Sequence, residues 1–173
     1  MRRTIKGDIT KMRVDAIVNA ANNQLNGGGG VDGAIHKVAG DKLHKACLQI
    51  GGCPTGEARI TKAFNLPAKY VIHTVGPIWN SEDNHETEIE LLKKCYWNSL
   101  KLAKEYSCKT IAIPNISTGV YGVPKIEAAH AAIETVTKFI NEIDNSLDVI
   151  FVCFDKLNYS IYQELCPKFE VIK

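Results

Sequence analysis

An aspartate and a histidine follow a run of four glycines in this chain. Asp32 and His36 stand four positions apart, within an amphipathic pattern that begins at Val31. Residues at that spacing share one face of a helix, so the carboxylate and the imidazole would lie side by side. A carboxylate there can orient a water molecule or accept its proton. Each residue also has an ordinary explanation, since helix dipoles favour acidic residues in the first turn and many histidines are structural.

The glycine run itself, at positions 27–30, joins a buried strand to that helix. An apolar, β-branched segment at 16–18 enters the run, and the amphipathic pattern leaves it. The first amides of a helix have no partner within the helix, and the dipole favours negative charge at that end. Glycine lets a ligand approach the backbone closely. We therefore interpret the run as a cradle for a diphosphate.

Polar residues crowd the end of the strand before the run. Asn19, Asn22 and Asn23 follow the apolar segment directly. In open α/β sheets, ligands lie outside the carboxyl ends of strands, where an asparagine can both donate and accept hydrogen bonds. Asparagines also favour turns for purely local reasons. Three of them beside a polyglycine loop favour a ligand site.

A second strand, loop and helix repeat this arrangement. The apolar strand 110–114 leads into a polar, glycine-containing loop at 115–124, and an amphipathic helix follows. The loops at 27–33 and 119–122 together hold seven of the 13 glycines, a concentration that scattered turns would not produce. Neither loop carries lysine or arginine, so a phosphate there would be held by backbone amides and helix ends.

Strands alternate with helices along the whole chain. Apolar runs and alternation predict strands at 3–6, 14–19, 57–63, 69–75, 110–114 and 148–154. Apolar spacings of three and four predict helices at 31–50, 86–105, 126–143 and, more briefly, 158–165. Such alternation indicates an α/β sandwich, and no linker or repeat divides the 173 residues. We expect a single domain over 1–173, with Tyr96 and Trp97 packing in it rather than binding a ligand.

Composition sets limits on compartment and partners. The chain carries a net charge of +2 and 45% apolar residues, without a basic face for nucleic acid. No apolar run approaches the roughly 20 residues that span a membrane, and the N-terminal residues contain no hydrophobic signal region. The six cysteines are scattered without a zinc-type pair, and most lie in apolar stretches where a thiol behaves as a small hydrophobe. We expect a reduced, cytoplasmic and monomeric protein.

The sequence carries neither of two familiar phosphate-binding motifs in its usual context. Gly28, Gly30 and Gly33 have the spacing of the dinucleotide fingerprint, but about eight residues separate them from the strand end. No acidic residue follows at the ribose-binding distance either, which argues against an NAD-dependent oxidoreductase. The sequence contains no Gly-Lys-Ser/Thr, which excludes a P-loop.

Taken together, the motifs along the chain resemble the macro domain family, and its MacroD-type branch in particular. The motifs are GDIT at 7–10, DAIVNAAN at 15–22, GGGGVDGAIH at 27–36, TGEA at 55–58, HTVGP at 73–77 and STGVYG at 117–122. The resemblance runs nearly from end to end. It implies a three-layer α/β/α sandwich with a mixed, mostly parallel sheet, and ADP-ribose as the ligand.

The resemblance also assigns parts of the ligand to residues. It implies that Asp8 holds the adenine amino group and that Phe154 stacks on the adenine. The diphosphate would lie between the two glycine loops, and the distal ribose near Asn22, Asp32 and Tyr121. The full set of implied binding residues is Gly7, Asp8, Ile9, Asn19, Ala20, Ala21, Asn22, Gly27, Gly28, Gly29, Gly30, Val31, Asp32, Ser117, Thr118, Gly119, Val120, Tyr121, Gly122, Val123 and Phe154.

The branch that the chain resembles consists of hydrolases. The implied reactions remove mono-ADP-ribose from acidic side chains of proteins and deacetylate O-acetyl-ADP-ribose, both of which are esters at the distal ribose. Asn22 would hold the ribose hydroxyls, and His36 would support Asp32. An aspartate at its ordinary pKa of about 3.9 is a weak base, so Asp32 either takes a proton from water or only orients the water while a substrate phosphate assists. Neither a metal nor a cofactor is required.

The alternative function is a reader that binds ADP-ribose without cleaving it, and the presence of Asn22, Asp32 and Gly33 favours the enzyme. No lysine lies between positions 19 and 36, which disfavours the covalent lysine route of other macro-domain hydrolases. Val123 stands where an aromatic residue often occurs in the family, and this difference would either loosen the distal-ribose pocket or alter the substrate preference.

Overall fold

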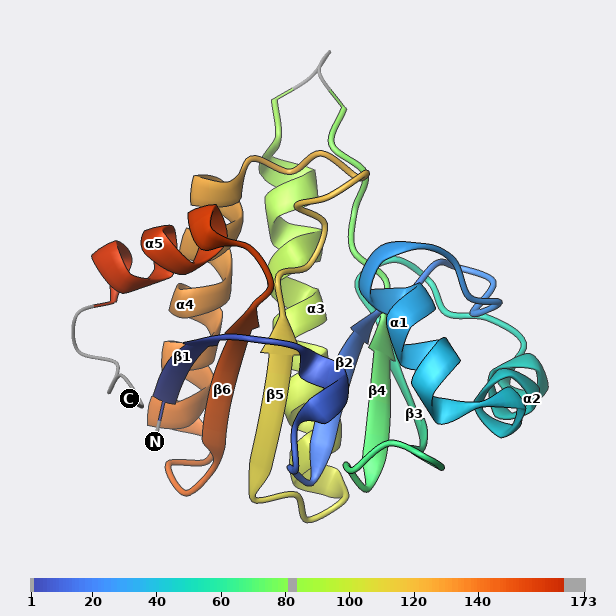
Figure 1. Cartoon of the computed structure of the whole chain (residues 1–173). Helices are drawn as coiled ribbons and strands as arrows, with labels where there is room; N and C mark the ends of the chain where they lie inside the picture. Colours follow the sequence, from blue (N-terminus) through green and yellow to red (C-terminus); the bar gives the residue numbers. More distant parts are fainter. Residues whose placement is uncertain (1, 81–83, 167–173) are drawn as a thin grey trace.

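A central sheet of six strands organises the residues that the computed structural model describes, 2–80 and 84–166. The strands are β1 (Arg2–Lys6), β2 (Ala16–Ala20), β3 (Ala58–Lys62), β4 (Tyr70–Thr74), β5 (Thr110–Pro114) and β6 (Asp148–Cys153). They lie in the order β1-β6-β5-β2-β4-β3, and all neighbours are parallel except β3 and β4 (Figure 1). The mixed, mostly parallel sheet that the sequence predicts is confirmed.

Helices cover both faces of this sheet. They are α1 (Gly30–Ala39), α2 (Asp41–Ile50), α3 (Glu86–Glu105), α4 (Lys125–Glu142) and α5 (Lys156–Leu165), with a short 3-10 helix η1 (Ile9–Lys11). Successive residues of β2 point to opposite faces. Val18 packs in a core with α3, α4 and α5, whereas Ile17 packs in a second core with α1, α2 and η1. Strands buried on both faces must be apolar throughout, which accounts for the runs seen in the sequence and confirms the three-layer sandwich.

One predicted element is wrong in its extent. The segment 31–50 forms two helices rather than one, and Figure 1 shows α1 and α2 separated by a turn. The turn is at Gly40, whose φ of 88° is rarely adopted by other residues and whose N–H closes α1 on the carbonyl of His36 at 3.0 Å. The apolar spacing continues across the break because Ile35 and Leu43 pack into the same core.

Aromatic and cysteine side chains serve the packing. Tyr96 is fully buried, and the Trp97 ring packs edge-on against Phe139 with 5.1 Å between centroids, so the prediction that both pack is confirmed. All six cysteines are buried free thiols, and burial raises the pKa of Cys47 and of Cys95 to about 11. Within the described ranges, no helix combines the length and apolarity needed to cross a membrane.

The strand order decides which loops meet at the carboxyl edge of the sheet. Because β2 and β5 are neighbours, the first glycine loop (residues 21–29) and the second glycine loop (residues 115–124) lie next to each other. Because β1 and β6 are neighbours, the turn after β1 meets the end of β6, where Gly7 donates its N–H to the carbonyl of Cys153 at 3.0 Å. Asp8, Phe154 and the two glycine loops therefore form a row along one edge.

Candidate functional site

The first glycine loop folds back against the start of α1. Gly33, in the first turn of that helix, donates its N–H to the carbonyl of Gly29 at 3.1 Å. A Cβ at position 33 would collide with the carbonyl oxygen of Gly28, so only glycine fits there. Gly28, Gly29 and Gly30 are exposed, at the helix end whose amides lack helical partners. An anion can bind there without a cationic side chain.

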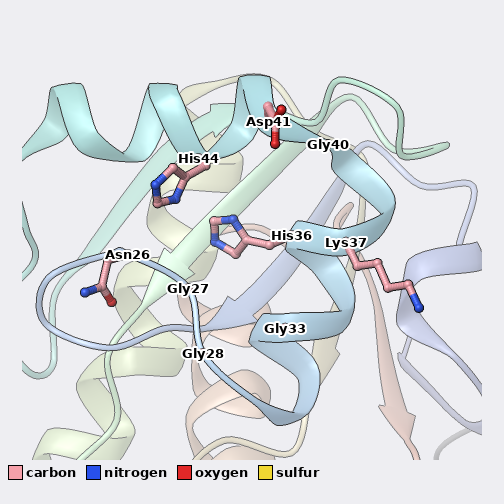
Figure 2. A pocket seen from close by; sticks show the side chains of 9 residues that line it. All are labelled: Asn26, Gly27, Gly28, Gly33, His36, Lys37, Gly40, Asp41 and His44. Atoms are coloured by element: carbon pink, nitrogen blue, oxygen red, sulfur yellow. The ribbon is translucent and has the colours of Figure 1, made fainter.

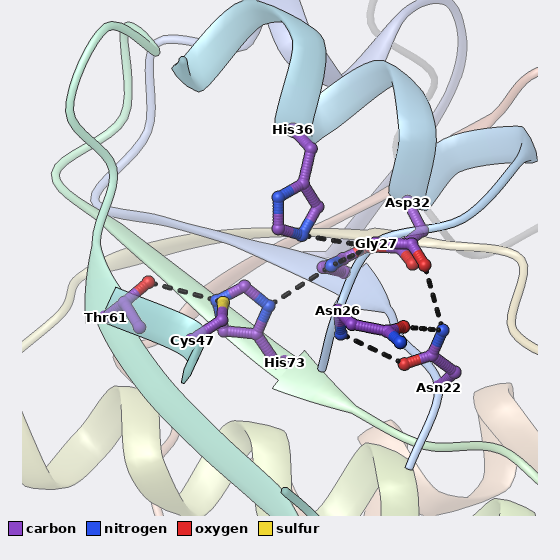
Figure 3. A network of polar contacts seen from close by, with 9 residues as sticks. Asn22, Asn26, Gly27, Asp32, His36, Cys47, Thr61 and His73 are labelled. Carbon is purple, nitrogen blue, oxygen red and sulfur yellow. Dashed lines mark hydrogen bonds and ion pairs between the residues drawn. The ribbon is translucent and has the colours of Figure 1, made fainter. Parts of the chain in front are cut away.

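Asp32 is buried directly behind this loop and is 5% exposed. Figure 3 shows its carboxylate between the loop and the side chain of His36. Oδ1 of Asp32 accepts a hydrogen bond from Asn19 Nδ2 at 2.9 Å and lies 3.4 Å from His36 Nε2. Oδ2 faces the loop, since a Cβ at Gly28 would lie 3.4 Å from it. One carboxylate oxygen is thus held by the protein, and the other is directed at the glycines. The prediction that Asp32 and His36 share a helix face is confirmed.

The surroundings of Asp32 change its acidity. Burial raises its pKa above the ordinary value of 3.8, and the Asn19 hydrogen bond and the charge of His36 partly oppose this rise. A carboxylate with a raised pKa is a better base than an ordinary aspartate. The structure therefore differs from the sequence analysis, which assigned Asp32 the pKa of an unperturbed side chain.

A buried network that the sequence analysis did not include lies behind Asn19. Nδ1 of His73 is 3.1 Å from Asn19 Nδ2, and Nε2 of His73 is 3.0 Å from Thr61 Oγ1. The thiol of Cys47 is 3.7 Å from the same Nε2. Burial, with a smaller contribution from the charge of His36, lowers the pKa of His73 to about 3, so the ring is neutral. A histidine inside an apolar strand was a visible signal, but its pairing with Asn19 depends on the strand register.

Asn22 holds the first glycine loop together. Its Nδ2 donates to Asn26 Oδ1 at 2.8 Å and to the carbonyl of Gly27 at 2.9 Å, and its Oδ1 accepts from the backbone N–H of Asn26 at 3.2 Å. Both amide hydrogens are therefore used within the loop (Figure 3). A ribose hydroxyl would meet Asn22 through the remaining lone pair of Oδ1. Asn23 binds the carbonyl of Cys53 at 3.0 Å instead, which fixes the loop to the next segment.

The second glycine loop is closed at its base and exposed at its tip. Val123 donates its N–H to the carbonyl of Ser117 at 2.9 Å, and Gly122 donates to that of Gly119 at 3.0 Å. Val120 at the tip is fully exposed. Val123 is 2% exposed and packs in the core with α3 and α4. Its side chain therefore packs below the loop, and the effect of this valine on the distal-ribose pocket stays a prediction.

Two hollows border the glycine loops. One of about 360 Å³ lies between the first loop, α1 and the start of α2 (Figure 2), and it is lined by Asn26, Gly27, Gly28, Gly33, His36, Lys37, Gly40, Asp41 and His44. The other, of about 260 Å³, lies between Asn23 of the first loop and Tyr121 of the second, and its further lining residues are Thr55, Gly76, Pro77, Ile78, Glu88 and Leu91. The backbone N–H of Trp79 donates to the backbone carbonyl of Tyr121 at 2.8 Å, which fixes the Tyr121 side of this second hollow.

The other end of the row is open. Asp8 is exposed, and its Oδ1 accepts from the Thr10 hydroxyl at 2.7 Å and from the Thr10 N–H at 2.9 Å. These bonds, the hydroxyl first, lower the pKa of Asp8 and leave Oδ2 available for a further donor. Phe154 follows the adjacent strand β6 and is 83% exposed. A fixed carboxylate and an exposed aromatic ring therefore follow two neighbouring strands at this end of the row.

The remaining predicted binding residues divide by burial. The buried ones are Ile9, Ala21 and Ser117, and the half-buried or exposed ones are Gly7, Ala20, Val31, Thr118 and Gly119. All lie in the loops of the same sheet edge or at the ends of the elements that border them. Within the part of the chain that the structure describes, no three histidine, cysteine or acidic side chains are grouped so as to hold a metal ion.

Comparison with known proteins gives a consistent result. A family model described as "Macro domain" matches residues 18–132. A protein of Escherichia fergusonii named O-acetyl-ADP-ribose deacetylase is 52% identical over 165 residues, which covers 93% of this chain and 92% of that protein. The Oceanobacillus iheyensis macrodomain solved with ADP is 49% identical, with 93% of this chain and 87% of the other covered and a TM-score of 0.87. The Trypanosoma brucei macrodomain in complex with ADP-ribose is 42% identical, with coverages of 94% and 67% and a TM-score of 0.87.

Proposed function

Since this chain belongs to the macro domain family, we propose that it is a hydrolase that binds ADP-ribose and cleaves acyl esters at the distal ribose. The proposed substrates are O-acetyl-ADP-ribose and proteins that carry mono-ADP-ribose on aspartate or glutamate side chains. The deacetylase name of the E. fergusonii relative supports the first substrate. The second is a finer proposal, and it rests on the same type of ester bond.

The row of loops supports ADP-ribose as the ligand. Asp8 offers an acceptor for an amino group and Phe154 an exposed ring for stacking, at one end of the row. The exposed glycines at the start of α1 offer amides to a diphosphate further along. The relatives solved with ADP and with ADP-ribose support the same ligand.

The observation that carries the proposed chemistry is the placement of Asp32. One of its oxygens is held by Asn19 and His36, and the other faces the first glycine loop. A water on that oxygen would lie beside a ribose held at the loop, and the raised pKa of Asp32 suits it to accept a proton from the water. The water adds to the ester carbonyl as Asp32 takes its proton, and collapse of the adduct then breaks the bond to the ribose oxygen. That oxygen takes up the proton from Asp32, and the products are a carboxylic acid and ADP-ribose.

The test uses the wild-type protein and both esters. Acetate release from O-acetyl-ADP-ribose and ADP-ribose release from an aspartate- or glutamate-modified protein would be followed, with calorimetric titration of ADP-ribose and of NAD in parallel. Cleavage of both esters would support the whole proposal, and cleavage of the acetyl ester alone would restrict it to deacetylation. Tight binding without cleavage would make the chain a reader. Tighter binding of NAD than of ADP-ribose would overturn the ligand assignment.

A further inference from the structure

We infer that His73 is a positioning residue for this site, because through Asn19 it keeps a hydrogen-bond donor, rather than an acceptor, facing the carboxylate of Asp32. The inference rests on the proposed role of Asp32 in hydrolysis. His73 is fully buried and so cannot touch a ligand itself. Figure 3 shows its ring between Thr61 on one side and the Asp32 end of the network on the other.

The sheet fixes the distances within this network. Asn19 of β2 and His73 of β4 are direct partners in the parallel pairing of the two strands, and both are fully buried. Asp32 reaches Asn19 from α1, and Thr61 reaches His73 from β3. Four elements therefore converge on two neighbouring strand residues, and none of these side chains can move far without disturbing the core.

The hydrogen bonds determine where the protons lie. Nδ2 of Asn19 contacts Asp32 Oδ1 at 2.9 Å and His73 Nδ1 at 3.1 Å, and an amide nitrogen can only donate. Nδ1 of His73 must therefore accept. Because the ring is neutral, its single proton is on Nε2, which is 3.0 Å from the hydroxyl oxygen of Thr61. The Thr61 hydroxyl can accept this proton, and Nδ1 of His73, left as an acceptor, keeps the nitrogen of the Asn19 amide directed inward.

The opposite orientation of the amide would suit a different state of Asp32. With the Asn19 oxygen turned inward, both neighbours would have to donate, which requires a proton on Asp32 and a proton on Nδ1 of His73. In the observed orientation, Oδ1 of Asn19 has no hydrogen-bond partner among the described residues. A buried acceptor without a partner is unusual. Here it results from the orientation of the Asn19 amide, in which both amide hydrogens are donated, one to Asp32 and one to His73. The network therefore favours the carboxylate form of Asp32, which both proposed roles of this residue require.

Among the described residues, few other titratable groups face Asp32, so a change in its titration can be assigned to the substituted residue. They are His36 from its own helix α1 and Cys47 from α2, with His73 behind Asn19, and His36 in turn faces His44 of α2 at 6.2 Å between ring centroids. Burial keeps Cys47 and His73 neutral, with pKa values of about 11 and about 3. All variants below leave His36 and His44 unchanged.

Three variants test the network, and a fourth serves as a control. His73→Leu removes the acceptor, whereas His73→Asn supplies an amide oxygen close to the place of Nδ1. Thr61→Val removes the partner of Nε2 at nearly constant size. His130→Leu, on the exposed face of α4, makes the same change as His73→Leu outside the network. Thermal unfolding and ADP-ribose binding identify the variants that are folded.

The decisive readouts are the pH dependence of ester hydrolysis and the ¹³C NMR titration of the Asp32 carboxyl. For His73→Leu we expect turnover about tenfold lower. The acid limb of its pH–rate profile should shift upward by about one pH unit, because the Asp32 carboxylate is easier to protonate once it loses a hydrogen-bond donor. Thr61→Val should give a smaller shift in the same direction. His73→Asn should stay close to wild type, and His130→Leu should match it.

Unchanged Asp32 titration in folded His73→Leu, or in Thr61→Val if the leucine variant does not fold, would overturn the inference. A His73→Asn variant that behaves like His73→Leu would do the same. If the wild type cleaves neither ester, the proposed function fails. The carboxyl titration still decides the role of His73 in that case.

Discussion

Asp32 and Phe154 stand at opposite ends of the same row of loops, yet one is 5% exposed and the other 83% exposed. Around Asp32, side chains from α1, β2, β4 and β3 converge in a buried network. Around Phe154 and Asp8, the side-chain contacts are local, since the Asp8 carboxylate accepts its hydrogen bonds from Thr10 in the same turn. The same sheet edge therefore carries one end built by the whole fold and one end built by single turns.

This difference matches the work proposed for each end. Chemistry needs a group held in a fixed direction and protonation state, which a buried network supplies. Recognition of a flat base needs an accessible ring and one oriented acceptor, and an exposed turn can present both. Changes at the buried end should therefore affect turnover, and also stability where they disturb the packing, while changes at the open end should affect binding alone.

The largest effect is expected from Gly33→Ala at the buried end. The new methyl group would collide with the carbonyl of Gly28, so the loop must shift, at a cost of about 1–3 kcal/mol in unfolding free energy together with weaker ADP-ribose binding. Denaturant unfolding measures this cost. The matched control is Gly29→Ala, where a Cβ meets nothing within 4 Å and the stability should hold. Equal stability of the two variants would contradict the packing described for the loop.

Phe154→Ala should weaken ADP-ribose binding about tenfold, because stacking of a base on an aromatic ring is worth about 1–3 kcal/mol. Unfolding free energy should stay unchanged, since the ring is 83% exposed. Calorimetry and thermal unfolding check both statements, with Phe154→Trp as the variant that retains a ring. Unaltered affinity in the alanine variant would remove Phe154 from the adenine site.

A smaller and more selective effect is expected from Asp8→Asn. Asparagine caps a helix as well as aspartate does, so the bonds to Thr10 should persist. Its amide can also donate a hydrogen, however, and should therefore bind the hypoxanthine analogue of ADP-ribose in preference to the adenine form by several-fold. Competition between the two ligands measures this preference. Loss of both ligands in equal proportion would mean that Asp8 shapes the turn only.

The buried end should also respond to acid. His73 has a pKa of about 3 in the folded state against 6.5 when exposed, so the unfolded chain binds more protons between these values. The contribution of the neutral His73 to stability is complete above pH 6.5 and is lost as the pH falls toward 3. The free energy of unfolding then changes by at most about 1.4 kcal/mol per pH unit. The raised pKa of Asp32 has the opposite effect on stability, which it lowers as the pH rises above 3.8. Denaturant unfolding of wild type and His73→Asn across pH 4–7 should show a shallower slope in the variant.

The sequence predicts the strands, both glycine loops and the helix face shared by Asp32 and His36, because each depends on local spacing. It fails at Gly40, since a turn between two helices that pack on the same core leaves the apolar period intact. It also misses His73 and Thr61, which reach Asp32 only through the pairing of three strands. Register is a property of the assembled sheet, so no local pattern contains it.

The spacing of residues in the sequence also does not predict the pKa of Asp32 or the burial of Val123. The raised pKa of Asp32 depends on how deeply the assembled fold buries it, and the buried position of Val123 depends on the packing of α3 and α4 below the loop. Phe154 falls inside the predicted strand 148–154, whereas β6 ends at Cys153 and leaves the ring 83% exposed.

The most direct test compares wild type with Asp32→Asn. Asparagine can keep an oxygen toward Asn19 and His36 but carries no negative charge, so the fold and ADP-ribose binding should survive. ADP-ribose release from a protein modified on aspartate or glutamate should fall by at least about 100-fold, because the variant has no base and orients water poorly. Release at the wild-type rate by a variant that binds ADP-ribose normally would contradict the account, and the chemistry would have to be assigned to another group.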